Sequence, residues 1–259
     1  MTISARLALA LGAWLALFAA PAAAQREPVL VPEVSQSLIE VRQGFTGARL
    51  LLYGAVIDPA ATGRAGDYDI VVVLKGPAEP IRIREKDRIA GIWMNAGTSD
   101  FRSAPSFFAV VSSRPISEIV DERTAAIYEL GTDFIQLSPS GEIEPKEQAR
   151  FASGLVALRR KQGLYQENPG GVRISEKVLY QARINLQSNV TTGRYTAETF
   201  AIARGRVLAS ATARIEVVKA GLEGRVVTAA QRWSFFYGLG AIALSLGMGW
   251  AAGRLFAKA

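Results

Sequence analysis

The sequence predicts a mainly β protein with two helices (α+β), whose strands form one or more immunoglobulin-like antiparallel β-sandwich regions, followed by one C-terminal transmembrane helix. Three observations support this fold class. Short apolar runs alternate with turn residues in the first third of the chain, apolar and polar residues alternate in the last third, and residues 233–253 carry no charge. Period two is typical of a half-buried strand, and an uncharged stretch of this length can cross a bilayer.

The first 24 residues have the composition of a secretory signal peptide. Arg6 precedes an uncharged apolar core, Leu7–Ala20, and the small residues Ala22-Ala23-Ala24 fit a signal-peptidase site before Gln25. The apolar core is too short to span a bilayer comfortably, so we expect cleavage rather than an uncleaved anchor. Cleavage implies that the body of the chain is exported.

Residues 25–113 are expected to form a β-sandwich domain. Its strands are predicted where apolar runs lie between turn residues: Leu38–Val41, Arg49–Ile57, Asp69–Leu74, Ile89–Asn95 and Pro105–Val111. The run Ile70-Val71-Val72-Val73 has no polar position, which indicates a strand buried on both faces, and Gly76-Pro77 ends it. Trp93 is most simply interpreted as a core residue.

Residues 114–171 are predicted to be a helical insert. One helix runs from Pro115 to Gly131, and a second begins near Pro145 and ends before Gly163. The basic residues 159–161 at the end of the second helix compensate its dipole or, less simply, form a binding site. The apolar side of the first helix consists of Ile116, Ile119, Val120, Ile127 and Leu130, and that of the second of Phe151, Leu155 and Leu158.

Residues 172–219 are predicted to be a three-stranded β region, and residues 220–232 a juxtamembrane linker. Apolar and polar residues alternate from Val178 to Leu186 and again from Val207 to Val217. Arg204-Gly205 provides a hairpin turn before the last strand. Because three strands bury little surface alone, we expect them to pack on the first sheet, on the helices or on a partner.

Residues 233–253 are predicted to be a transmembrane helix and residues 254–259 a cytoplasmic tail. Trp233 and Trp250 lie near the ends of the span, where amphipathic rings prefer the headgroup region. Export of the body would place it in the periplasm and the span in the inner (plasma) membrane, in contact with the lipid bilayer. Small side chains recur every four residues and favour self-association or packing on a membrane protein partner: Ala241, Ser245, Gly249 and Gly253.

The 259-residue chain contains no Cys and no His, and its formal charge is +7. Without these residues, thiolate nucleophiles, Ser–His–Asp triads and imidazole-bound metals are excluded. We therefore expect no enzymatic activity, no cofactor and no metal site. Asp58, Asp67 and Asp69 could offer oxygen ligands to calcium, but their spacing is not that of a calcium-binding loop. The small positive excess and the export signal also argue against nucleic acid binding.

The strongest candidate for ligand binding is a row of cations at every second position: Arg82, Arg84, Lys86 and Arg88. In an extended strand these side chains share one face and could bind a small anion, a lipid headgroup or an acidic partner. Strict alternation would turn Glu85 and Asp87 toward the core, a conflict that a hairpin or bulge near these residues would remove. The alternative is a solvated strand face.

Several segments together resemble an alphaproteobacterial transmembrane protein family. They are Phe45-Thr46-Gly47, Val71-Val72-Val73 with Gly76-Pro77, Arg84-x-Lys86-x-Arg88, Gly91-Ile92-Trp93-x-Asn95, Pro105-Ser106-Phe107-Phe108, Glu176-Lys177-Val178-Leu179-Tyr180 and Gly193-Arg194-Tyr195-Thr196. The resemblance covers nearly the whole mature chain. It implies a signal peptide, an extracytoplasmic β-rich region and one C-terminal span, and it carries no catalytic residues. It also implies sulfite-exporter-type permeases as partners, because family members are encoded near them.

Together these features favour a non-enzymatic accessory protein or binding partner of an envelope or transport complex. One alternative is a small-anion or lipid-headgroup binding module that uses Arg82 and Arg84. Another is an envelope hydrolase that uses carboxylates, or Ser and Lys.

Overall fold

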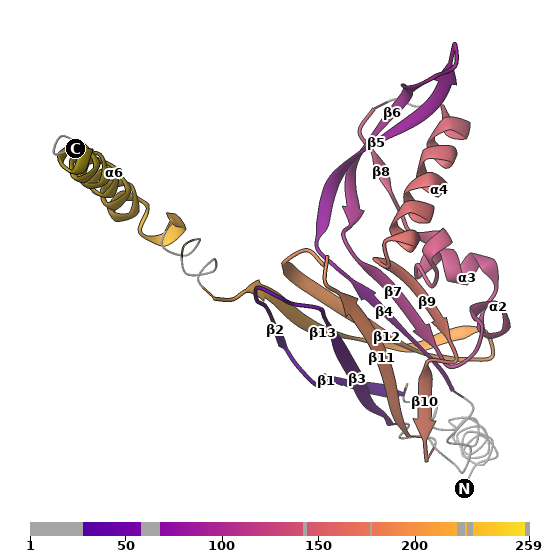
Figure 1. Ribbon diagram of the computed structural model, residues 1–259. Helices are drawn as coiled ribbons and strands as arrows, with labels where there is room; N and C mark the ends of the chain where they lie inside the picture. The colour runs from indigo at the N-terminus through magenta and orange to yellow at the C-terminus, as the bar shows by residue number, and fades with distance from the viewer. Residues whose placement is uncertain are drawn as a thin grey trace, which may run out of the picture.

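The computed structural model describes residues 28–57, 68–141, 144–176, 178–221, 226 and 230–256 (Figure 1). The predicted signal peptide, residues 1–24, lies outside the described residues, as do Asp58, Asp67 and the end of the predicted tail, residues 257–259. The described chain is mainly β structure with several helices and one long apolar C-terminal helix, which confirms the predicted class. The immunoglobulin-like arrangement of the strands stays a prediction.

Two sheets make up the body of the protein, and each contains strands from both ends of the sequence. The four-stranded sheet has the order β1 (Val29–Val34), β3 (Gly47–Ile57), β11 (Leu179–Gln187) and β10 (Val172–Ser175). The six-stranded sheet has the order β2 (Leu38–Val41), β13 (Arg206–Lys219), β12 (Gly193–Ala203), β4 (Asp69–Lys75), β7 (Phe108–Ser112) and β9 (Tyr165–Pro169). The strands of residues 172–219 therefore pair with strands of the first third.

Side chains from both sheets share one hydrophobic core. Every residue of β4 from Ile70 to Leu74 is fully buried, which confirms a strand covered on both faces. One face of the six-stranded sheet meets side chains of β3 and β11 in this core, and the segment after β7 that contains the short helices contributes Ile119, Ala125 and Leu130. We call the two sheets with these helices the two-sheet body.

Strand β11 follows the period-two prediction. Its buried side chains are Tyr180, Ala182, Ile184 and Leu186, and the residues between them are exposed. The turn predicted at Arg204-Gly205 is also confirmed, because it joins β12 to β13 and both residues have positive φ, 52° and 74°. Positive φ at both central positions is the mark of a type I′ turn, whose twist matches that of the strands.

The helix predicted from Pro115 to Gly131 is wrong, because the chain forms α2 (Ile116–Ile119), α3 (Glu122–Ile127) and the 3-10 turn η1 (Thr132–Phe134) instead. The Asp121 backbone is extended, and its carboxylate accepts a hydrogen bond from the Thr124 N–H at 3.0 Å. An N-cap of this kind starts a new helix rather than continuing one. As a result, Ile127 is exposed rather than on an apolar face.

A long hairpin and one helix form a second layer of packing. The hairpin consists of β5 (Ala78–Ile89) and β6 (Ile92–Pro105), with the short β8 (Ser138–Pro139) beside β6. Helix α4 (Pro145–Lys161) begins at the predicted Pro145 and packs Phe151 and Leu155 against the hairpin's Phe101. Leu158, expected in the same stripe, is about half exposed. Figure 1 shows the hairpin projecting beyond the end of α4.

Helix α6 (Ser234–Phe256) contains the predicted membrane span. Its segment Ser234–Arg254 is long and apolar enough to cross a membrane, and none of it is buried against the rest of the described chain. Figure 1 shows it as a separate helix at the end of the chain. An apolar helix without cover from its own protein needs another apolar environment.

Candidate functional site

The candidate site is the part of the β5–β6 hairpin beyond α4. Its turn consists of Ala90 and Gly91, with φ of 52° and 86°, so it is a type I′ turn that pairs Ile89 with Ile92. The single strand predicted from Ile89 to Asn95 is therefore wrong. The turn was not predicted because apolar residues lie on both sides of Ala90-Gly91. A two-residue loop that ends in Gly between two apolar runs is nevertheless a sequence signal for a hairpin.

The assignment of Trp93 to the core is also wrong, because its side chain is 68% exposed. Trp93 lies opposite Arg88 near the turn, where none of the described elements covers the hairpin. Three further apolar side chains of this region are exposed: Ile89 at 49%, Ile92 at 68% and Met94 at 51%. We call residues 89–94 the hairpin tip. The tip was not predicted as a site because residues 89–95 were expected to form a single strand, with Trp93 in the core.

One face of β5 packs toward α4. Ile81 and Ile83 contact the small hydrophobic cluster around Phe101, and they are flanked by Glu79 and Glu85 on the same face. Glu79 accepts from Arg159 at 2.7 Å, and a guanidinium nitrogen of Arg150 lies 2.9 Å from a Glu85 carboxylate oxygen. The expected conflict at Glu85 is therefore resolved by an ion pair with α4.

A bulge does occur here, but on the opposite strand. Glu85 pairs with Gly97 and Lys86 with Asn95, so Ala96 is the extra residue of β6. A Cβ atom at Gly97 would lie 3.1 Å from the ring of Phe151, so a glycine permits the close approach of α4 at this point. The bulge thus lies where the hairpin contacts Arg150 and Phe151 of α4.

The opposite face of β5 carries the predicted cations, all of them exposed: Arg82, Arg84, Lys86 and Arg88. Arg82 donates two hydrogen bonds to Asp100, at 2.6 and 2.9 Å, and this pairing lowers the pKa of Asp100. The other three cations lie opposite Thr98, Asn95 and Trp93. Among the described residues, no carboxylate lies within ion-pair distance of these three. Arg82 is thus engaged in an ion pair. Arg88 donates from Nε to the Gly91 carbonyl oxygen at 3.2 Å, but its charge, like those of Arg84 and Lys86, has no carboxylate partner among the described residues.

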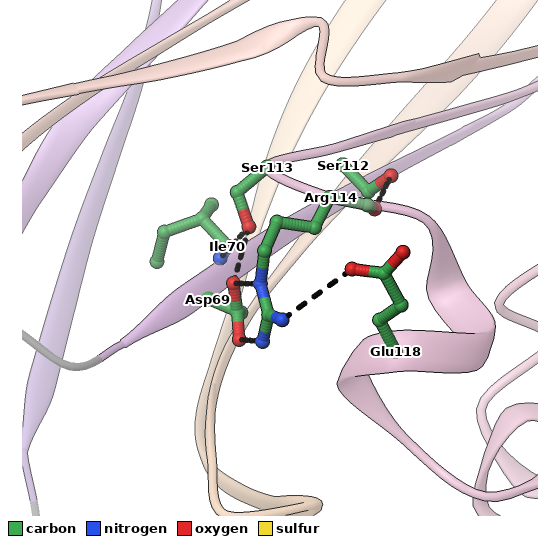
Figure 2. A network of polar contacts seen from close by, with 6 residues as sticks. All are labelled: Asp69, Ile70, Ser112, Ser113, Arg114 and Glu118. Atoms are coloured by element: carbon green, nitrogen blue, oxygen red, sulfur yellow. Dashed lines mark hydrogen bonds and ion pairs between the residues drawn. The ribbon is translucent and has the colours of Figure 1, made fainter.

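A second polar network holds strand ends of the two-sheet body together (Figure 2). Asp69, at the start of β4, accepts from Arg114 Nε at 2.9 Å, from a terminal Arg114 nitrogen at 2.5 Å, and from the Ser113 hydroxyl at 2.8 Å. The Ser113 oxygen in turn accepts from the Ile70 N–H at 3.3 Å. The bond from Arg114 lowers the pKa of Asp69. Because Arg114 binds both carboxylate oxygens, Asp69 is occupied by structural bonds rather than open to calcium.

Lys75 and two glutamates line a pocket of about 240 Å³ beside Tyr128. The Lys75 ammonium lies 2.6 Å from Glu129 and 3.2 Å from Glu198. Burial lowers the pKa of Lys75, but the two glutamates together raise it by more, so the net shift is upward. Lys75 is therefore held as a cation, unlike the neutral lysine that nucleophilic catalysis requires.

Two of the three basic residues at the end of α4, Arg159 and Arg160, have carboxylate partners among the described residues. Besides the pair of Arg159 with Glu79, Arg160 contacts Asp133 and Glu167, both at 3.2 Å. Burial raises the pKa of Glu167, but its hydrogen bonds from Thr132 and the charge of Arg160 outweigh burial and lower it. These bonds fix the helix end to β5, η1 and β9. Within the described residues, no group of three or more Asp and Glu side chains is arranged to hold a metal ion.

The small-residue stripe lies on α6. Ser245 donates from its hydroxyl to the Ala241 carbonyl at 2.9 Å, so its polar group is satisfied within the helix. A Cβ atom added at any glycine of α6 would meet nothing within 4 Å, because no other part of the described chain packs on this helix. What distinguishes the stripe is its four-residue spacing of small side chains, which lets a neighbouring helix approach closely.

In the part of the chain that the structure describes, a β-rich body is followed by one uncovered apolar helix, the arrangement of a membrane protein with a candidate C-terminal span. The chain belongs to the family described as "Putative transmembrane protein (Alph_Pro_TM)", which it matches over residues 29–258. This match confirms the resemblance found from the sequence. No curated protein shows significant sequence similarity to the chain.

Proposed function

We propose that this is a single-pass inner-membrane protein whose β-rich body lies in the periplasm and acts as a non-enzymatic accessory or binding partner of an envelope or transport complex. The observation that carries the proposal is the complete exposure of α6: none of Ser234–Arg254 is buried by the described chain. A bilayer covers such a helix and keeps the body at the membrane surface.

The chemistry of the body supports a binding role rather than catalysis. The sequence has no His and no Cys, and the partly buried charges described above are bound to one another. Lys75 is held as a cation by two glutamates, and Asp69 is held by Arg114. General acid–base catalysis needs a group that can exchange its proton near neutral pH, and these pairs oppose such exchange.

The membrane partner is expected to contact the small-residue side of α6. Gly249 and Gly253 leave room there for another helix to approach closely. A sulfite-exporter-type permease is the partner that the family resemblance favours. The signal peptide expected from residues 1–24 supports a periplasmic body and a cytoplasmic end after Arg254.

Crosslinking in native membranes tests this function. A photoreactive residue at Ser245 should crosslink a discrete integral membrane protein, and Gly249→Leu should abolish the product because it fills the close-contact side. Gly247→Leu is the matched control: it is the same substitution about 160° further round the helix, since adjacent residues differ by about 100°. Recovery of the uncrosslinked chain alone from each sample would contradict the accessory role.

Protease added to spheroplasts tests the orientation separately. The body should be degraded from outside, while α6 remains with the membrane after carbonate extraction. A body that is protected in intact spheroplasts and digested only after lysis would place it in the cytoplasm, which contradicts the proposal.

A further inference from the structure

We infer that the hairpin tip inserts into the surface of an anionic lipid bilayer and gives the body a second membrane contact besides α6. This contact rests on the proposed membrane tether, but not on the accessory role. The ligand is the bilayer itself rather than a free anion. The hairpin has apolar side chains at its end and cationic side chains behind them, which is the order in which a protein entering a bilayer surface meets acyl chains and phosphates.

The end of the hairpin is apolar on both sides of the ribbon. Ile89 and Ile92 face each other across the type I′ turn, Met94 follows Ile92 on the same face, and Trp93 points to the other face. All four side chains are between 49% and 68% exposed. Such a concentration at one projecting point differs from the scattered apolar residues of an ordinary surface and marks an interaction site.

The cations lie behind this apolar end, at distances along the strand that match the depth of the headgroup layer. With about 3.3 Å per residue, Arg88 is roughly 3 Å, Lys86 roughly 10 Å and Arg84 roughly 17 Å from Ile89 along the strand. Apolar groups of peripheral proteins enter about 5–10 Å, to the boundary of headgroups and acyl chains. Arg88 and Lys86 would therefore lie among phosphates when Ile92 and Trp93 reach the acyl boundary.

Charge complementarity favours an anionic surface. Arg84, Lys86 and Arg88 have no ion-pair partner among the described residues, and Glu85 is neutralised by Arg150. Asp87 is the remaining acid of this segment, and its carboxylate accepts from the Arg88 N–H at 2.7 Å. Juxtamembrane cations are attracted to anionic headgroups within a Debye length, and Trp prefers the interface.

Backbone chemistry limits the depth of insertion. Beyond its short pairing with β8, the hairpin is a two-stranded ribbon, and its outer edges leave N–H and C=O groups without strand partners among the described residues. Unpaired backbone groups are too costly in the hydrocarbon core, so an open ribbon cannot span it. The contact therefore ends at the headgroup boundary, where water and phosphates satisfy these groups.

The tether permits this contact. Residues 220–233 separate β13 from α6, and a chain of that length reaches at most about 50 Å when extended. This length limits how far the β13 end of the body can lie from the bilayer. Because the body cannot diffuse away, its hairpin tip meets the bilayer at a higher effective concentration than in a free protein, which favours even a weak interfacial contact.

The absence of Cys permits a direct measurement of tip insertion. Ile92→Cys in the full chain, purified from membranes and placed in nanodiscs, provides one site for a nitrobenzoxadiazole fluorophore. With phosphatidylglycerol present, its emission should shift to shorter wavelength and be quenched by lipids that carry a spin label near the headgroup. The matched control is Ile127→Cys on α3, which has similar exposure at 61% and no neighbouring cationic row; it should show neither change.

Charge variants then test the electrostatic part. In the Ile92→Cys background, Lys86→Gln should lower the ratio of inserted to free tip about fivefold, and discs of phosphatidylcholine alone should lower it further. Because α6 holds each variant in the disc, unchanged emission in both lipids would overturn the hairpin contact while leaving the tether intact. Loss of the chain from the discs would instead overturn the tether. A shift without lipid quenching that rises with protein per disc would identify a second copy as the occupant and also overturn it.

Discussion

The two-sheet body and the β5–β6 hairpin are both antiparallel β structure with period-two sequences, yet their apolar side chains have different environments. In β11, each second residue from Tyr180 to Leu186 is buried because the facing sheet extends along the whole strand. In β5, Ile81 and Ile83 are covered by α4, whereas Ile89 is about half exposed. Alternation therefore determines which side of a sheet a residue faces, but only the neighbouring element determines whether that side is covered.

Charged residues differ between the two regions in the same way. The pair of Asp69 with Arg114 joins the ends of β4 and β7, and the Asp69 side chain is only 18% exposed. The pair of Arg82 with Asp100 has the same bidentate geometry across the hairpin, but both side chains are more than 40% exposed. We therefore expect the second pair to stabilise the fold less despite its similar geometry, because water screens it more strongly.

Truncation of one aromatic residue in each region should give the largest difference. Phe108 is fully buried, with its ring in an edge-to-face contact with Tyr165 at 6.1 Å between centroids. Phe108→Ala should lower the free energy of unfolding by about 3–5 kcal/mol, whereas Trp93→Ala should change it by less than about 0.5 kcal/mol. Urea unfolding of the nanodisc-bound chain, followed by circular dichroism, measures both. Similar losses for the two variants would show that the tip is part of the core.

Acid stability should distinguish the two ion pairs. The folded pKa of Asp69 is lowered below its ordinary value of 3.8, so the unfolded chain takes up this proton first as the pH falls. The stabilisation is present above the unfolded pKa and is lost as the pH falls from about 3.8 through the folded pKa. Asp69→Asn should cost about 1–2 kcal/mol at neutral pH and remove this part of the acid dependence.

Asp100→Asn is the matched control for Asp69→Asn, since it removes the carboxylate from an equivalent bidentate pair. Its effect at neutral pH should be clearly smaller because the pair is exposed. Unfolding midpoints in urea at a series of pH values compare the variants. If both lose the same stability, exposure does not account for the difference between the two regions.

Local sequence signals predicted much of the fold. The continuous apolar run of β4, the alternation of β11, Pro145 at the start of α4 and the Arg204-Gly205 turn were all confirmed. Each of these features depends on a residue and its immediate neighbours. The helix break at Asp121 was missed because Asp is compatible both with a helix interior and with an N-cap, and only the backbone conformation decides between them.

The candidate site could be predicted only in part. Period two predicted the cationic face of β5, but the partner of Arg82 lies 18 residues away and that of Glu85 lies 65 residues away. Such distant pairs leave no local pattern. The exposure of Trp93 was missed for a similar reason: an apolar strand looks the same in sequence whether or not a helix such as α4 extends far enough to cover it.

The type I′ turns at Ala90-Gly91 and Arg204-Gly205 can also be compared. Glycine substitutions there are expected to change the free energy of unfolding least among the variants proposed. Ala90 and Arg204 both have φ of 52° and precede a Gly, and a left-handed conformation costs a residue other than Gly about 1 kcal/mol. Arg204→Gly should raise the global free energy of unfolding by up to about 1 kcal/mol, because β12 pairs with β4 in the core. Ala90→Gly should leave the global value unchanged and slow hydrogen exchange only near the tip, since a segment without burial opens locally. Urea unfolding and hydrogen exchange by mass spectrometry measure the two effects.

An equal gain in the global free energy of unfolding from Ala90→Gly would mean that the tip unfolds together with the body. A tip coupled to the body in this way would behave as a rigid extension of the core rather than as an independent contact.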